Sequence, residues 1–191
     1  MNQKDRKIIV AITGASGSVY AKSLIAKLSS LKEPPAEIAV ILTETAKDIW
    51  KYETGKDFIA ICPAKEYDNN TFYAPFASGS STFDTMIICP ASMGMTGRIA
   101  NGISDDLISR AADVIIKEKR RIIIVPREAP YSLIHLRNME TLTLAGAVIC
   151  PASPSFYSKP STVDELVNTI VERIISLAGF ESESYHWMEN E

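Results

Sequence analysis

Three short apolar runs, each followed by a loop of small, polar or proline residues, constrain the fold of this chain more than any other feature. Unbroken runs rich in Ile and Val are typical of strands buried on both faces of a parallel sheet. Loops that follow the carboxyl ends of such strands gather in one crevice, where ligands bind. The runs and their loops are residues 8–12 with 13–18, 85–89 with the loop around Ser92, and 121–125 with 126–130.

Two further strands are expected at residues 36–42 and 147–150, and helical patterns separate the strands. A helix is expected over 44–54, and another from about Leu136 to Ala145. This alternation predicts an α/β fold, a three-layer Rossmann- or flavodoxin-like parallel sheet. The whole chain, 1–191, is interpreted as a single domain in which residues 180–191 form a C-terminal tail. Residues 55–84 show the least regular pattern and are interpreted as a long loop, functional as a lid or packed on the core.

The charge, the cysteines and the apolar runs of the chain limit the kinds of partner that it is expected to bind. A net charge of −3 gives no general attraction to nucleic acid or to an anionic membrane. The three cysteines are scattered and lack CxxC spacing, which argues against a disulfide framework or a zinc site and favours a reducing, cytoplasmic setting. No apolar run approaches the ~20 residues of a membrane span. We therefore expect small-molecule ligands, with no nucleic acid and no membrane.

The loop at residues 13–18 is suited to a phosphate group. Its glycines allow close backbone approach, and the amides at the start of the following helix carry partial positive charge. Neither the GxGxxG nor the Walker pattern is present, since Ser16 stands at the second glycine position of the former. A tight turn without a ligand is the alternative. Thr43, after the strand at 36–42, is neutral where dinucleotide folds often carry an acid.

The Ser92 loop contains neither an acid nor a histidine, so its hydroxyls and amides suit a polar ring or a phosphate better than a metal. Two prolines frame Arg127 and Glu128 and stiffen their backbone, which favours a functional pair over a surface ion pair. His135 and His186 have no Cys, Ser or metal-ligand partner at a diagnostic spacing. Hydrolytic and metal chemistry are therefore poorly supported, and no metal is expected.

Charged residues on the helices are less informative by themselves. Glu53 lies about one turn from Trp50, and taken alone it is best interpreted as a solvated surface charge. Arg110 and Lys117 fall two turns apart on roughly one side of a helix. Their simplest interpretation is a pair of exposed charges near Asp106 and Asp113.

Six motifs, taken together and in order, resemble the UbiX family of flavin prenyltransferases. The resemblance runs from about residue 8 to residue 178, and the Pro-Arg-Glu-Ala-Pro loop is its most specific part. The motifs are Thr13–Gly17, Ala77–Ser80, Cys89–Met93, Arg110–Val114, Val125–Pro130 and Pro154–Tyr157.

The resemblance implies that FMN binds between the subunits of a homo-oligomer, such as a dodecamer. It implies the transfer of a dimethylallyl group from dimethylallyl monophosphate to N5 and C6 of reduced FMN, without a metal. The product, prenylated FMN, would pass to a UbiD-type decarboxylase.

The resemblance also assigns roles to residues. Glu53, Glu128 and Ser16 correspond to catalytic positions, the two acids relaying protons to the phosphate or from the ring. The flavin-binding positions are Gly14, Ala15, Ser16, Thr43, Ser92, Met93, Gly94, Met95 and Arg110. Those for the prenyl donor are Lys117, Arg127, Tyr157, Arg173 and Trp187. Cations suit a departing phosphate, and aromatic faces suit an allylic cation.

Two other functions compete with this interpretation. One is a flavin-dependent decarboxylase of the phosphopantothenoylcysteine type, which shares the fold but relies on a catalytic histidine in a different motif. The other is a subunit that only stores FMN or delivers it. The set Glu53, Lys117, Arg127, Glu128 and Arg173 speaks against simple storage, because storage needs no second anionic site.

Overall fold

The computed structural model describes residues 5–181, which form one six-stranded parallel sheet in the order β3-β2-β1-β4-β5-β6. The strands are β1 Lys7–Ile12, β2 Glu37–Leu42, β3 Ala64–Asp68, β4 Phe83–Ala91, β5 Arg121–Pro126 and β6 Val148–Ile149. The helices are α1 Ser18–Ser29, α2 Glu44–Thr54, η2 Pro75–Ala77, α3 Met93–Ala100, α4 Leu107–Lys117, α5 Leu133–Leu144 and α6 Val163–Leu177. The predicted α/β class with a flavodoxin-like parallel sheet is confirmed.

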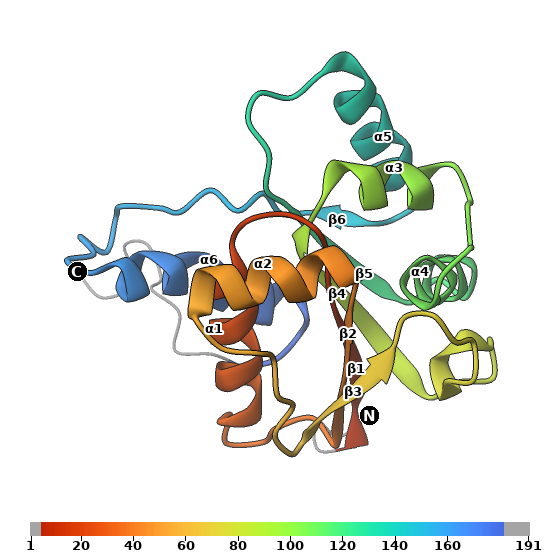
Figure 1. The fold of residues 1–191 in the computed structure, drawn as a ribbon, viewed down its shortest axis with the longest axis horizontal. Helices are drawn as coiled ribbons and strands as arrows, with labels where there is room; N and C mark the ends of the chain where they lie inside the picture. Colours follow the sequence, from red (N-terminus) through yellow and green to blue (C-terminus); the bar gives the residue numbers. More distant parts are fainter. Residues whose placement is uncertain (1–4, 182–191) are drawn as a thin grey trace.

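Helices cover both faces of the sheet, so the fold has three layers (Figure 1). Side chains alternate between the two faces along β1: Ile8 and Val10 join the core under α1, α2 and α6, whereas Ile9 joins the core under α3 and α4. Because β1 is buried on both faces of the sheet, its sequence is an unbroken apolar run.

The sheet contains one strand that the sequence pattern did not predict. Residues 55–84 include β3 at the edge of the sheet and the short helix η2. Only Ala64 of β3 is buried, and Tyr67 donates its hydroxyl hydrogen to Glu37 at 2.7 Å. An edge strand paired only with β2 does not need an apolar run, so its sequence carried no strand signal.

The ends of the described chain are held together. Arg6 forms an ion pair with Asp84 at 2.7 Å, donates to the carbonyl of Ala178, and stacks over the ring of Phe180 at 4.2 Å. Phe180, the first residue of the predicted tail, is buried. The rest of that tail lies outside the described residues, apart from Glu181. In the described range, no helix is long and apolar enough to cross a membrane.

The strand order places a topological switch point between β1 and β4. From β1 the chain moves outward to β2 and β3, and it then returns to the other side of β1 for β4, β5 and β6. In open parallel sheets ligands bind outside the carboxyl ends of the strands at such a point. The carboxyl ends of β1 and β4 are followed by the Thr13 and Ser92 loops, so the crevice predicted from the sequence lies here.

Candidate active site at the switch point

The loops after β1 and β4 are joined by one buried hydroxyl group. Thr13 Oγ1 donates to the carbonyl of Pro90 at 2.9 Å and accepts from the backbone N–H of Ser92 at 2.7 Å. The backbone N–H of Thr13 also donates to Pro90, at 3.2 Å. The motif Thr13–Gly17 predicted no separate role for Thr13, but its side chain links the two loops that form the floor of the crevice. The threonine immediately after a buried strand was the available signal.

Replacing Thr13 with Val should lower the free energy of unfolding by about 1 kcal/mol, the lower end of the cost of leaving a buried donor without an acceptor, because the Ser92 N–H is only partly buried. The donor concerned is the N–H of Ser92, whereas the Pro90 carbonyl keeps its bond from the Thr13 backbone. Urea denaturation measures the effect. A Thr13→Ser variant keeps the hydroxyl and serves as the control. Equal stability of the Val variant and the wild type would contradict this role.

Ser92 also begins α3. Its hydroxyl caps the helix by accepting from the N–H of Met95 at 3.3 Å, and its carbonyl accepts from Thr96 at 3.0 Å. The amides of Met93 and Gly94, in the first turn, have no acceptor within the helix. No other atom lies within 4 Å of the position that a Cβ on Gly94 would take, so the backbone there is open to a ligand. Free helix amides with partial positive charge fit a phosphate or another anionic group of a ligand.

The start of α1 has a different arrangement, because a carboxylate of the chain itself occupies it. Glu53, on α2, accepts hydrogen bonds from the N–H of Gly17 at 3.1 Å and of Ser18 at 2.7 Å. Partial burial raises the pKa of Glu53, but the hydroxyls of Ser16 and Ser18 and these two amides outweigh it and hold the pKa below its ordinary value. Glu53 is exposed, as expected for a surface charge, but it also binds the N-terminus of α1 and is held in its ionised form there.

Arg127 connects the loop after β5 to the same place. Its backbone N–H donates to Ala91 at 3.2 Å, and its side-chain Nε donates to the carbonyl of Ser16 at 2.8 Å. The adjacent Glu128 is exposed and accepts from the N–H of Ala129 at 3.0 Å. The structure thus brings Ser16, Glu53 and Arg127 together, each from a different strand–helix unit.

The remaining predicted residues near this edge have supporting positions. Thr43 caps α2 by accepting from Ala46 at 3.1 Å, and a Cβ on Gly14 would meet the Thr45 side chain at 3.0 Å. Ala15 donates to the carbonyl of Thr13 at 2.7 Å. Met93 and Met95 are buried, so their side chains act as core while their backbone faces the loop.

Two donor-site candidates come from the last third of the chain. Arg173, on α6, is exposed and lies close enough to Cys150 for its charge to act on that thiol. Burial is the larger influence and raises the pKa of Cys150, while the charge of Arg173 opposes it. Tyr157 is exposed in the loop after β6. Tyr157 thus follows the carboxyl end of β6, as Arg127 follows that of β5. Trp187 lies outside the described residues.

Arg110 and Lys117 do not join this group within one chain. Arg110 donates to the carbonyl of Ala77 at 3.0 Å and pairs with Asp113 at 3.1 Å. Lys117 ends α4, pairs with Glu118 at 2.7 Å and lies against Gly79, before β4 begins. Arg127 follows the opposite, carboxyl end of the sheet, so Lys117 and Arg127 of the same chain occupy different edges.

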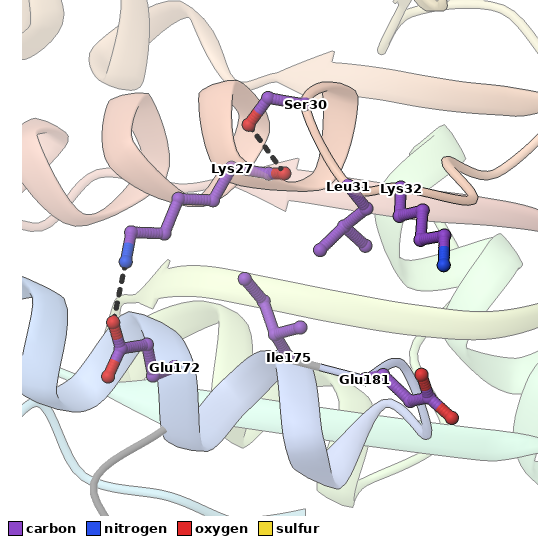
Figure 2. Close-up of a pocket in the computed structure, with 7 residues that line it drawn as sticks. All are labelled: Lys27, Ser30, Leu31, Lys32, Glu172, Ile175 and Glu181. Carbon is purple, nitrogen blue, oxygen red and sulfur yellow. Dashed lines mark hydrogen bonds and ion pairs between the residues drawn. The ribbon is translucent and has the colours of Figure 1, made fainter. Parts of the chain in front are cut away.

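A separate hollow of about 570 Å³ lies between the end of α1 and α6 (Figure 2). Lys27 reaches across it to Glu172 at 2.6 Å, and Lys32 and Glu181 line its other end from opposite sides. Its charges largely balance, and it contains none of the predicted site residues. In residues 5–181, no three His, Cys, Asp or Glu side chains are placed to hold a metal.

Comparison with known proteins gives a consistent result. The model of the flavoprotein family matches residues 1–175. The chain is 43% identical to the flavin prenyltransferase UbiX of Methanocaldococcus jannaschii, over 92% of this chain and 95% of the relative. A solved structure of AnUbiX (PadA1) in complex with FMN and dimethylallyl pyrophosphate is 38% identical and has a TM-score of 0.87. The match covers 98% of this chain and 100% of the solved chain. A dodecameric FMN-dependent UbiX-like decarboxylase from Escherichia coli O157:H7 is 34% identical with a TM-score of 0.86, over 95% and 99% of the two chains.

Proposed function

The chain belongs to the UbiX family of flavin prenyltransferases, and from this premise we propose that it joins a dimethylallyl group from dimethylallyl monophosphate to N5 and C6 of reduced FMN. The observation that carries the proposal is the meeting of Arg127 and Glu53 at the switch-point crevice, beside the open amides of α3. A cation for a departing phosphate and an ionised carboxylate for a proton are the two groups that this transfer requires.

The flavin is held by the loops after β1, β2 and β4. The amides of Met93 and Gly94 bind an electron-rich group, and Ser92 fixes the loop that presents them. Gly14, Ala15, Ser16, Thr43 and Met95 complete this wall of the crevice. Reduced FMN, when bound, supplies the electron-rich N5 and C6 atoms that receive the prenyl group.

The donor phosphate is bound by Arg127 and Arg173 with help from Tyr157, which all follow the carboxyl ends of β5 and β6. As the C–O bond to the donor breaks, the negative charge grows on the phosphate and these cations stabilise it. Glu53, ionised at neutral pH, accepts the proton released from the flavin ring. Glu128 protonates the leaving phosphate, and Trp187, which lies outside the described residues, is assigned to the prenyl donor.

Lys117 and Arg110 act from a neighbouring copy. Because they lie away from the crevice of their own chain, they reach a flavin and a donor only across a subunit contact. A homo-oligomer is supported by the dodecameric relative. We place the protein in the cytoplasm, in keeping with its three free cysteines, and assign its product to a UbiD-type decarboxylase.

The first experiment is anaerobic. Reduced FMN and dimethylallyl monophosphate are mixed with the purified protein, and the mass of the released flavin is expected to increase by one five-carbon unit. The diphosphate is tested in parallel to identify the donor. Unchanged FMN with both donors, while FMN still binds, would overturn the transferase proposal in favour of storage and delivery.

The decarboxylase alternative has little support in the described residues. Among residues 5–181 its catalytic histidine would have to be His135, which lies in the first turn of α5 and accepts from the N–H of Ser132 at 3.3 Å in a capping box. His186 lies outside the described residues. That position serves the helix terminus, and no hydrogen bond within residues 5–181 connects His135 to the crevice.

A further inference from the structure

Helix α5 presents an apolar surface to solvent. Four of its large aliphatic side chains are at least half exposed: Leu133 62%, Ile134 70%, Leu136 50% and Leu144 83%. Only Leu142 of its twelve residues is buried. Large apolar side chains exposed on one helix of a globular protein are candidates for an interaction site where they share a side of the helix. In Figure 1, α5 stands beside α3 at the outer margin of the fold.

The inner side of α5 is already used. Leu142 belongs to the core, and Asn138 lies against Gly97 of α3, where a Cβ on that glycine would be 3.1 Å from Nδ2. The opposite side carries Leu133, Arg137, Glu140 and Leu144, which are separated by four, three and four residues and so form one row along the helix. All four are exposed. Within residues 5–181 neither Arg137 nor Glu140 has an ion-pair partner.

The order of this row is self-complementary. Read forward it is apolar, positive, negative, apolar, and read backward the charges exchange while the leucines keep their places. Two copies of α5 packed antiparallel about a twofold axis, centred between Asn138 and Met139, would therefore bring Arg137 of each against Glu140 of the other. Leu133 would then meet Leu144. Reciprocal contacts of this kind define an isologous interface.

We propose that the outer face of α5, the row Leu133–Arg137–Glu140–Leu144, is a twofold contact with a second copy of this chain. The proposal rests on the homo-oligomeric state in the proposed function and specifies one of its contacts. A different protein would have no reason to match the row in both directions. α5 begins shortly after the loop of Arg127 and Glu128, so the contact stabilises the margin of the crevice.

Charge exchange tests the proposal. Arg137→Glu places four like charges at the contact and Glu140→Arg does the same with opposite sign, so each variant should weaken the association of copies at least about tenfold. The double variant Arg137→Glu with Glu140→Arg should restore the wild-type mass. So should co-expression of the two single variants under different tags, because a mixed pair has opposite charges at both contacts. Light scattering after gel filtration and native mass spectrometry give the masses.

Matched controls separate this contact from general effects. Lys22→Glu makes the same change in net charge on the exposed side of α1, and should leave the mass unchanged. Leu144→Asp should dissociate the contact, whereas Val163→Asp, at a residue that is 71% exposed on α6, should not. FMN binding, measured by absorbance, and the flavin mass assay report on the proposed function separately.

The possible outcomes are distinct. Dissociation by the single variants with rescue in the double variant and in the mixture supports the twofold contact. Dissociation without rescue would overturn it in favour of a head-to-tail contact between copies. Unchanged masses in all variants, or a wild-type protein that is a monomer, would also overturn it and leave a different protein, such as the recipient decarboxylase, as the occupant of α5.

Discussion

Replacing Glu53 with Gln should lower the rate of prenyl transfer about 10²–10⁴-fold, the range for loss of a positioned general base, while FMN still binds. The glutamine oxygen can continue to accept from the amides of Gly17 or Ser18, so the start of α1 remains capped. The amide cannot take up the ring proton. Single-turnover flavin mass measurements give the rate, and quenching of flavin fluorescence gives the affinity.

A Glu44→Gln variant is the matched control, because it makes the same chemical change on the exposed first turn of α2. It should transfer the prenyl group at the wild-type rate. Wild-type turnover in the Glu53 variant would eliminate Glu53 as the base and leave it only a structural role.

The pKa of Glu53 also predicts a pH effect on stability. Because the pKa is below its ordinary value in the folded protein, the carboxylate contributes stability above the pKa of the unfolded chain. That contribution is lost as the pH falls through the folded pKa. The Glu53→Gln variant should therefore lose less stability than the wild type on acidification, which thermal melts across the acidic range would measure.

Replacing Arg127 with Ala should lower kcat/KM for the prenyl donor about 10²–10³-fold, as expected when one donor to a developing negative charge is removed. Arg127 uses Nε to bind the Ser16 carbonyl, and its other guanidinium nitrogens are free to face a phosphate. FMN binding should change much less, because the backbone amides of α3 that are assigned to the flavin remain in place when this side chain is shortened.

An Arg127→Lys variant distinguishes charge from geometry. Lysine restores the positive charge but not the planar fork, so its activity should fall between those of the Ala variant and the wild type. Equal kcat/KM in the Ala variant and the wild type would remove Arg127 from the donor site. Loss of FMN binding in both variants would assign Arg127 to the flavin.

The sequence predicted the central strands because they are buried on both faces. β1, β4 and β5 carry unbroken Ile- and Val-rich runs, and their loops meet at the switch point as expected. β3 escaped prediction because an edge strand with a single buried residue needs no such run. The ends of helices were predicted less accurately than the strands. Helix α5 begins at Leu133, three residues earlier than predicted, because Ser132 caps it.

Contacts between side chains distant in sequence were the harder part of the site. Nothing in the local pattern around Glu53 showed that its carboxylate binds the amides of Gly17 and Ser18, because those groups are more than thirty residues away. Spacing on one helix likewise gave no sign that Lys117 would point away from Arg127. The family resemblance assigned Lys117 and Arg127 to the prenyl donor. Only the three-dimensional arrangement showed that these two residues lie at opposite ends of the strands of the sheet.

The single hydroxyl of Thr13 that links the Pro90 carbonyl to the Ser92 amide has a consequence for binding energetics. Because the two loops are already linked through it, the ligand meets a floor whose conformational entropy was lost during folding rather than on binding. Binding therefore does not have to order these two loops, and no entropic cost for ordering them reduces the affinity. Association at this wall needs no rearrangement of the loops. The entropic cost of assembling the complete site falls instead on the segments that approach from elsewhere.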